Sequence, residues 1–192
     1  MNTGAISARY AKALFDVAKK HGTEDKVYEE METIANSFWA VPELKKAMLN
    51  PLVNNDERKK LLLSAAGNDK TPVSDELSKF IDLVIEHKRE AHFQTISLVY
   101  QDVYRKIKNI VIGKLTTANE PESSLVEKMK QLVFQIAKLP ADGKVEFETV
   151  VDPKIIGGFQ LQVGSDLLDA SVSSQLQEIR KILLEKAATS SI

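Results

Sequence analysis

Apolar side chains recur every three or four residues through the first half of the chain, a spacing that places them on one face of an α-helix. In the first segment, at residues 4–20, Tyr10, Leu14 and Val17 follow this spacing. Similar stripes, separated by short polar connections, continue to Lys108. The later segments are expected to begin near Thr23, Pro42, Asn54, either Thr71 or Ser74, and Glu90. Six amphipathic helices with short connections predict an all-helical bundle.

Local signals mark the ends of these helices. Gly22 follows a basic tail, which is typical of a helix C-terminus because glycine tolerates a left-handed backbone and cations suit the carbonyl end. Asn54, followed three residues later by Glu57, matches a capping box. Pro51 marks a break, because a proline disfavours helical backbone in the residue before it.

After Lys108 the pattern changes. Apolar and polar residues alternate at 144–151 and at 159–163, which indicates half-buried β-strands. The expected order is a strand at 110–117, a helix opened by Pro121, a strand at 144–151, a strand at 159–163 with a hairpin at Gly164, and a helix capped by Ser171. This part reads as β-α-β-β-α, with three or four short strands.

The two patterns together predict an α+β fold. An all-α six-helix bundle is expected at residues 1–108, and a small α/β domain is expected at residues 109–192. The residues between Arg105 and Asn109 are expected to form a joint of limited bending between the two domains.

Composition narrows the possible functions. The chain has 192 residues, of which 43% are apolar, so two small packed domains are feasible. Its 26 basic and 27 acidic residues give a net charge of -1, which is untypical of a nucleic-acid-binding protein. No apolar run approaches the roughly 18 residues needed to span a bilayer, so we expect a soluble protein without direct membrane insertion. The absence of cysteine excludes disulfides and thiolate chemistry.

No motif indicates a catalytic, metal or cofactor site. His21, His87 and His92 lack the i, i+4 helical spacing that brings two imidazoles to one metal ion. Nucleophile elbows, phosphate loops and dinucleotide-binding glycine patterns are absent. Gly157 and Gly158 open a strand instead of a helix, which favours a tight turn or close packing over phosphate binding. We therefore expect no catalytic residues, no metal and no cofactor.

The first helix is rich in alanine, including Ala8, Ala11 and Ala13. Small side chains allow another helix to approach closely, so a groove beside this helix could accept an amphipathic helix from a partner. The same residues equally suit tight packing inside the bundle, and the residues alone leave both interpretations open. The basic clusters at 58–60 and 105–108 lack interleaved aromatic residues, which favours solvated helix faces and no nucleic-acid partner.

Four segments, in this order, carry a family resemblance. They are ARYAKALFDVAKKHG at 8–22, NPLVNNDERKKLL at 50–62, FIDLVIEHKR at 80–89 and DPKIIGGFQLQVGSDLLDASVSSQLQEIRKIL at 152–183. The last combines G-G-F, a strand and turn, and D-x-S-V before an amphipathic helix. Over nearly its whole length the chain resembles the delta (OSCP) subunit family of F-type ATP synthases, in its bacterial form. Residues 67–74 and 140–144 carry no recognisable family residues.

The resemblance implies a non-catalytic stator subunit of a proton-translocating synthase. In the family, a groove between the first and fifth helices of the bundle receives the N-terminal helix of an alpha subunit of the catalytic head. The C-terminal domain binds the b subunits of the peripheral stalk. The implied groove residues are Tyr10, Ala13, Leu14, Val17, Phe80 and Val84. The implied stalk-binding residues are Gly157, Gly158, Phe159, Val172, Leu176 and Ile179.

The resemblance also implies one copy per complex and a peripheral location at the cytoplasmic face of the bacterial cell membrane. A helical-bundle scaffold or adapter unrelated to ATP synthase would explain the helices equally well, but not the ordered family segments. A small α+β enzyme would need a set of convergent polar residues, and none can be named from the sequence.

Overall fold

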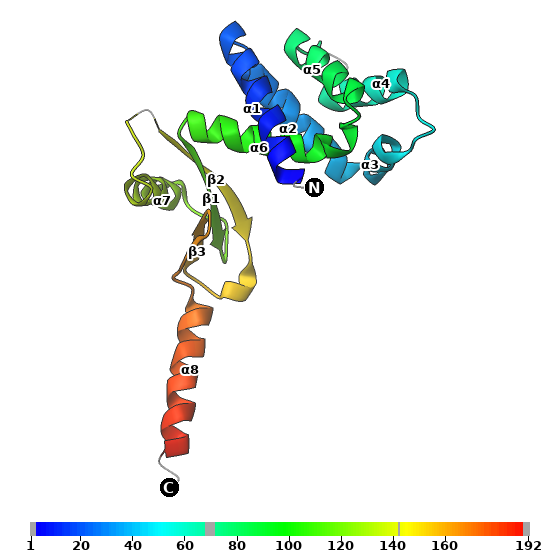
Figure 1. Cartoon of the computed structure of the whole chain (residues 1–192). Helices are drawn as coiled ribbons and strands as arrows, with labels where there is room; N and C mark the ends of the chain where they lie inside the picture. Colours follow the sequence, from blue (N-terminus) through cyan, green and yellow to red (C-terminus); the bar gives the residue numbers. More distant parts are fainter. Residues whose placement is uncertain (1–2, 68–71, 142, 190–192) are drawn as a thin grey trace. The chain divides into compact units, whose positions relative to one another are not determined.

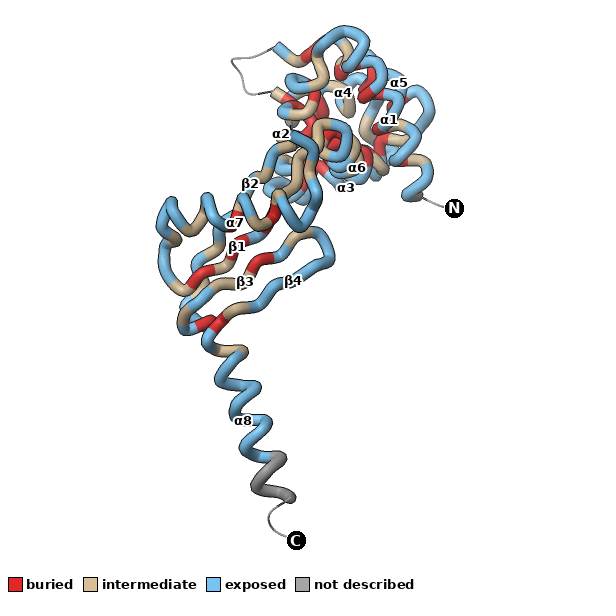
Figure 2. Tube along the Cα trace, turned by 90° about the vertical axis from the view of Figure 1, so that its left-hand side faces the viewer, coloured by how far each residue is buried: buried red, intermediate tan, exposed pale blue. Residues whose placement is uncertain are grey.

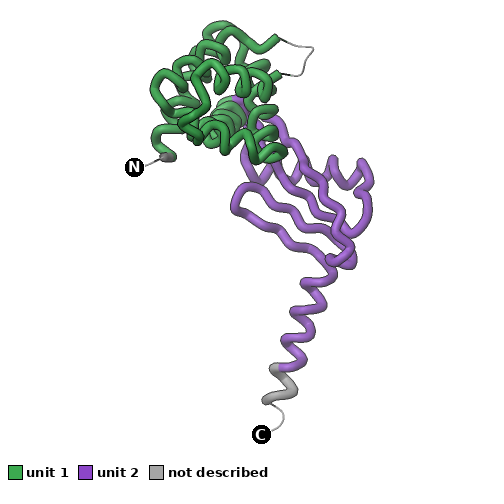
Figure 3. The backbone as a smooth tube through the Cα atoms, turned by 90° about the vertical axis from the view of Figure 1, so that its right-hand side faces the viewer, with its two compact units in different colours: residues 1–107 green, residues 108–192 purple. Residues whose placement is uncertain are grey.

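The computed structural model describes residues 3–67, 72–141 and 143–189 (Figure 1). The chain forms two compact units, Met1–Ile107 and Lys108–Ile192, which Figure 3 colours separately. The observed division follows Ile107, whereas the boundary expected from the sequence follows residue 108.

The first unit is the predicted six-helix bundle. Its elements are α1 (Thr3–His21), α2 (Glu24–Ala40), α3 (Pro42–Leu49), α4 (Asn55–Ala66), α5 (Asp75–Glu86), the 3₁₀ turn η1 (Glu90–His92) and α6 (Phe93–Ile107). The start of α5 follows Ser74, and the alternative start at Thr71 lies outside the described residues. The sixth helix begins later than predicted, at Phe93. Lys88, with φ 55, turns the chain sharply out of α5, and a 3₁₀ turn completes the reversal before α6.

Two helix-end signals are confirmed by their hydrogen bonds. Gly22 has a φ of 70, and the backbone N–H groups of Gly22 and Thr23 donate to the carbonyls of Lys19 and Ala18. This is a Schellman motif, in which a left-handed residue satisfies the last carbonyls of a helix. At α4, the Asn54 side chain accepts from the Glu57 N–H at 2.8 Å, and the Glu57 carboxylate accepts from the Asn54 N–H at 3.4 Å.

The core of the bundle lies where α1, α2 and α6 pack together. Phe15 is 1% exposed, and its ring centroid lies 6.1 Å from that of Tyr100 and 6.4 Å from that of Tyr104. Burying each large apolar side chain contributes about 1.5–3 kcal/mol relative to exposure. This core fixes α1 in place and leaves an adjoining face of the helix to contact α5.

The second unit is a four-stranded sheet with helices. Its elements are β1 (Ile110–Thr117), α7 (Ser123–Ile136), β2 (Lys144–Val151), the 3₁₀ turn η2 (Pro153–Ile155), β3 (Phe159–Val163), β4 (Asp166–Asp169) and α8 (Val172–Thr189). The strand order is β2-β1-β3-β4. β1 is parallel to β2 and antiparallel to β3, which is antiparallel to β4. The hairpin predicted at Gly164 thus adds β4 as a fourth strand, within the expected three or four.

Helix α7 covers one face of this sheet (Figure 2). Leu115 and Leu161, from the two central strands, pack with Met129 and Val133 of α7 to form its buried core. The alternation in β2 follows from this packing, because Val145 and Phe147 lie against the core while Glu146 and Glu148 are exposed. In the described parts of the chain, no helix combines the length and apolar character needed to cross a membrane.

Candidate partner-binding sites

A groove of about 220 Å³ runs between α1 and α5. Its lining residues are Ala13, Leu14, Val17, His21, Glu76, Lys79, Phe80 and Leu83. Val17 is 44% exposed and Leu83 is 42% exposed, so apolar surface is open on both walls. Ala13 is also exposed, and its small side chain leaves room for close approach of another helix.

The structure brings most of the sequence-predicted groove residues together. Ala13, Leu14, Val17 and Phe80 line the groove. The ring of Tyr10 meets that of Phe80 edge to face, with 6.2 Å between the ring centroids, and so continues the same α1–α5 contact.

Val84 requires a correction. Its side chain is 0% exposed, so it belongs to the bundle core and offers no surface to a partner. It lies one helical turn beyond Phe80 on the apolar stripe of α5, on the part of that stripe which the rest of the bundle covers. We therefore leave Val84 out of the groove.

A polar contact between two residues that line the groove joins the two helices. The Nδ1 atom of His21, in the last turn of α1, lies 2.8 Å from Oε1 of Glu76, in the first turn of α5. The Glu76 carboxylate also accepts a hydrogen bond from its own backbone N–H. That bond, with a smaller contribution from His21, lowers the pKa of Glu76. With Tyr10 beside Phe80 and His21 beside Glu76, α1 and α5 run antiparallel.

The second candidate site is centred on the junction between the sheet and α8. Gly158 has a φ of 75, and a Cβ atom at this position would lie 2.2 Å from the carbonyl oxygen of Ala170. Two backbone hydrogen bonds lie on either side of this close contact between Gly158 and Ala170. The N–H of Val172 donates to the carbonyl of Gly157 at 3.0 Å, and the N–H of Ala170 donates to the carbonyl of Phe159 at 2.9 Å. The G-G-F and D-x-S-V segments are therefore paired with each other in the fold.

Asp169 completes this junction. Its carboxylate accepts hydrogen bonds from the Ser171 N–H at 2.8 Å, the Ser174 hydroxyl at 2.7 Å and the Gln160 amide at 3.0 Å. Hydrogen bonds from the hydroxyls of Ser171 and Ser174, followed by that from the Ser171 N–H, lower the pKa of Asp169 to about 2. The Ser171 hydroxyl accepts from the Ser174 N–H at 3.3 Å, which makes Ser171 the predicted cap of α8.

Helix α8 presents an apolar stripe that the rest of its own unit leaves open. Val172, Leu176, Ile179 and Leu183 are 36%, 51%, 54% and 61% exposed. After its first turn, α8 is exposed over residues 175–184 (Figure 2). The four residues of this stripe are spaced by four, three and four positions, which is the spacing of the a and d positions of a coiled coil. Of the predicted stalk-binding residues, Gly157, Gly158 and Phe159 contact the chain at the base of this helix, and Val172, Leu176 and Ile179 lie on its exposed stripe.

The structure adds residues that the sequence analysis did not assign to the groove. His21, Glu76, Lys79 and Leu83 also line the α1–α5 groove. Helical spacing could have indicated two of them, because His21 is four residues after Val17 and Leu83 is three after Phe80. Lys79 and Glu76 are polar residues beside an apolar stripe, and the periodicity of apolar residues does not identify polar residues that line a groove.

In the part of the chain that the structure describes, neither site has a set of side chains that could hold a metal ion. Within residues 3–67, 72–141 and 143–189, no group of three or more histidine or acidic side chains is placed to hold a metal ion. The groove is mainly apolar, and the surface of α8 is an apolar stripe flanked by polar residues. Both are suited to binding other protein segments.

Comparison with known proteins gives a consistent result. A family model described as ATP synthase delta (OSCP) subunit matches residues 6–183. The ATP synthase subunit delta of Phocaeicola vulgatus is 42% identical over 186 residues, covering 97% of both chains. That of Bacteroides fragilis is 39% identical over 186 residues, with the same coverage.

A solved structure supports the fold. A chain of the mitochondrial ATP synthase hexamer of Toxoplasma gondii superposes with a TM-score of 0.64 at 23% identity. The match covers 93% of this chain and 97% of that one. With the family model and the relatives, these findings favour a synthase subunit over an unrelated scaffold. The chain therefore belongs to the ATP synthase delta (OSCP) subunit family and is a non-catalytic stator component of that enzyme.

Proposed function

We propose that this protein is a two-ended tether that links the catalytic head of a proton-translocating F-type ATP synthase to its peripheral stalk. The α1–α5 groove receives the N-terminal helix of an alpha subunit, and the second unit binds the b subunits through α8 and the junction at its base. One copy serves each complex, peripherally, at the cytoplasmic face of the bacterial membrane. The observation that carries the proposal is the open apolar groove on an otherwise well-packed bundle.

The groove has the properties that a helix-binding site needs. Its floor is formed by the nearly buried Leu14 and Phe80, so it exists before a partner arrives. Val17 and Leu83 extend from its two walls and would lose their contact with water when an amphipathic helix docks. Removing apolar surface from water contributes about 25 cal/mol per Å². A preformed groove also lowers the ordering cost of binding.

The stripe on α8 suits a different partner geometry. Its heptad spacing allows side chains to interlock with those of long helices that lie alongside it. The peripheral stalk, built from b-subunit helices, offers such surfaces. The junction around Gly158 and Asp169 fixes the first turn of α8 to the sheet, so a load on the helix passes into the folded unit.

This arrangement explains how the protein could work without chemistry. Rotary synthesis requires the head to be held still while the rotor turns, and a tether does this by binding at both of its ends. The strength of each contact, and not a reaction rate, then determines how well the tether holds the head still.

The groove is tested by titration calorimetry against a synthetic peptide of the cognate alpha-subunit N-terminus. We expect one-to-one binding with a negative heat-capacity change, the mark of apolar burial. Ala13→Asp should abolish this binding with the fold intact, because Ala13 is exposed and a buried unpaired charge costs several kcal/mol. Ala8→Asp is the matched control, since Ala8 is exposed on α1 but does not line the groove. Binding by a folded Ala13→Asp variant would refute the groove assignment.

The stalk contact is tested separately with the soluble part of the cognate b subunit. Ile179→Asp should weaken its binding strongly and leave alpha-peptide binding unchanged. Gln177→Asp introduces the same charge on a nearby exposed position outside the apolar stripe, and should have little effect. Equal loss in both variants would mean that the stripe is not the contact surface.

A further inference from the structure

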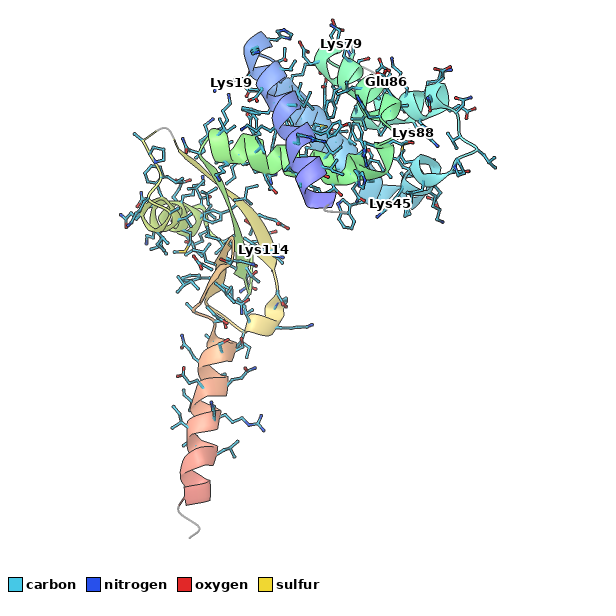
Figure 4. The ribbon with its side chains drawn as sticks, in the orientation of Figure 1. Lys19, Lys45, Lys79, Glu86, Lys88 and Lys114 are labelled. Atoms are coloured by element: carbon cyan, nitrogen blue, oxygen red, sulfur yellow. The ribbon has the colours of Figure 1, made fainter. Side chains whose placement is uncertain are left out.

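The groove between α1 and α5 contains a lysine, Lys79, whose charge helps to lower the pKa of the nearby Glu76 without forming an ion pair with it. Lys79 lines the groove and is exposed. Within the described residues, its ammonium group forms neither a hydrogen bond nor an ion pair. The acid one turn earlier, Glu76, is already engaged by His21 and by its own backbone N–H. Figure 4 shows Lys79 on α5, at the part of the bundle where this helix begins.

The other lining residues cannot determine where along the groove a partner helix stops. Ala13, Leu14, Val17, Phe80 and Leu83 are apolar, and His21 and Glu76 are already paired with each other through Nδ1 and Oε1. A helix that slides by one turn, about 5.4 Å, presents a similar apolar stripe to such a surface. In helix–helix recognition, register is commonly set by a polar residue that is favourable in one alignment only.

We propose that Lys79 is a specificity residue that sets the register of the docked helix by pairing with an acidic side chain on it. The inference rests on the proposed function of the groove, and adds the alignment of the docked helix, which that function does not specify. A partner helix with an acid beside its apolar stripe, at the level of Lys79, binds in a single alignment. A helix with a basic residue there is repelled.

The position of Lys79 makes this reading geometrically consistent. It is one turn after Glu76 and one turn before Leu83, so it stands between the His21–Glu76 contact and exposed apolar surface. A docked helix would cover Leu83 and exclude water from one side of the ammonium group. Partial loss of water strengthens an ion pair relative to a fully exposed one.

The experiment scans charge along the partner and compares three forms of the full-length protein. The probe is the cognate alpha-subunit N-terminal peptide, remade with a single Glu at each position that flanks its apolar stripe. Each peptide is titrated against the native protein, Lys79→Glu and Lys19→Glu. Lys19 is the matched control, because it has the same charge change on α1 without lining the groove (Figure 4).

We expect Glu at one position to tighten binding to the native protein and to weaken binding to Lys79→Glu. The difference between the two proteins should be about five-fold at low salt and should shrink at high salt. Lys19→Glu should keep the native ranking of the peptides. An identical ranking with the native protein and with Lys79→Glu would overturn the role of Lys79. Failure of every peptide to bind the native protein would instead refute the groove function itself.

Discussion

A Cβ atom on Gly158 would lie 2.2 Å from the carbonyl oxygen of Ala170, closer than real contacts of this kind allow. Gly158 also has a φ of 75, a region that other residues enter at a cost of about 1–2 kcal/mol. Two independent constraints therefore require glycine at this position. Together they explain why the G-G-F segment and the start of α8 are found as a unit.

Gly158→Ala should destabilise the second unit by more than the backbone cost alone, because the new methyl group also forces Ala170 away. Gly164→Ala provides the control. Gly164 has a φ of 59, but its added Cβ would meet nothing within 4 Å, so this variant should lose only the backbone cost of about 1–2 kcal/mol. Thermal unfolding followed by circular dichroism compares the two. Equal losses would show that the contact with Ala170 is unimportant.

Asp169 should make stability depend on pH in acid. Its pKa in the folded protein is about 2, below its ordinary value of 3.8. The unfolded state therefore binds the proton more readily, so the hydrogen bonds of Asp169 stabilise the fold above about pH 4 and this contribution is lost as the pH falls towards 2. Asp169→Asn should lower the free energy of unfolding at pH 7, and the difference from the native protein should shrink towards pH 2. Denaturant unfolding between pH 7 and pH 2 measures this difference in the free energy of unfolding. Asp166→Asn, at the other end of β4, is the control. A difference that stays constant with pH would contradict the prediction.

Removing one partner of the ion pair between Arg58 and Glu90 should lower the free energy of unfolding more than removing both partners together. Glu90 is 7% exposed, and its carboxylate pairs with the Arg58 guanidinium, which also donates to the Asn50 carbonyl at 2.7 Å. Arg58→Met leaves a buried carboxylate without its partner, which typically costs about 3–5 kcal/mol. The double variant Arg58→Met with Glu90→Leu should recover much of that loss. Denaturant unfolding tests both, and a double variant no more stable than the single one would argue against this account.

The joint between the units should be shorter than the sequence suggested. The guanidinium of Arg105 donates to the Tyr28 hydroxyl at 3.0 Å and lies over the Tyr28 ring, so this residue belongs to the bundle. The carbonyl of Asn109 accepts from the Lys144 N–H at 3.0 Å, so this residue belongs to the second unit. We predict that limited bending is confined to the connection at Lys108, between the end of α6 at Ile107 and Asn109. Small-angle scattering of the free protein should require several orientations of the units, and one fixed shape would count against this.

Helix content was readily predicted because the apolar periodicity is strong, but some helix ends were not. Lys88 and Lys138 end α5 and α7 with φ values of 55 and 48. Arg89 and Leu139, which follow them, donate back to Val84 and Phe134 in the pattern seen after Gly22. Glycine usually occupies such positions, so a lysine there carries no stop signal in the sequence.

The prediction of the candidate site was incomplete, because the sequence pattern does not show which apolar residues are covered. Val17 and Val84 both lie on apolar stripes, yet Val17 is 44% exposed and Val84 is 0% exposed. Periodicity identifies the apolar face of a helix, but not which part of that face is covered by neighbouring helices. The pairing of Gly158 with Ala170, and of Asp169 with the start of α8, joins residues whose contact depends on the register of β3 and β4.

The strand register of the second unit also bears on how it would carry mechanical load. The chain enters β1 at Ile110, while Thr117 at the other end of β1 pairs with Phe159, and Gln160 pairs with Asp169 just before α8. Tension between the start of β1 and α8 would therefore act along the strands. Hydrogen bonds between strands run across that direction, so many of them would have to shear at once. They could not unzip one by one. Such a sheet yields little until a high force is reached, a property that would suit a part loaded on every turn of a rotor.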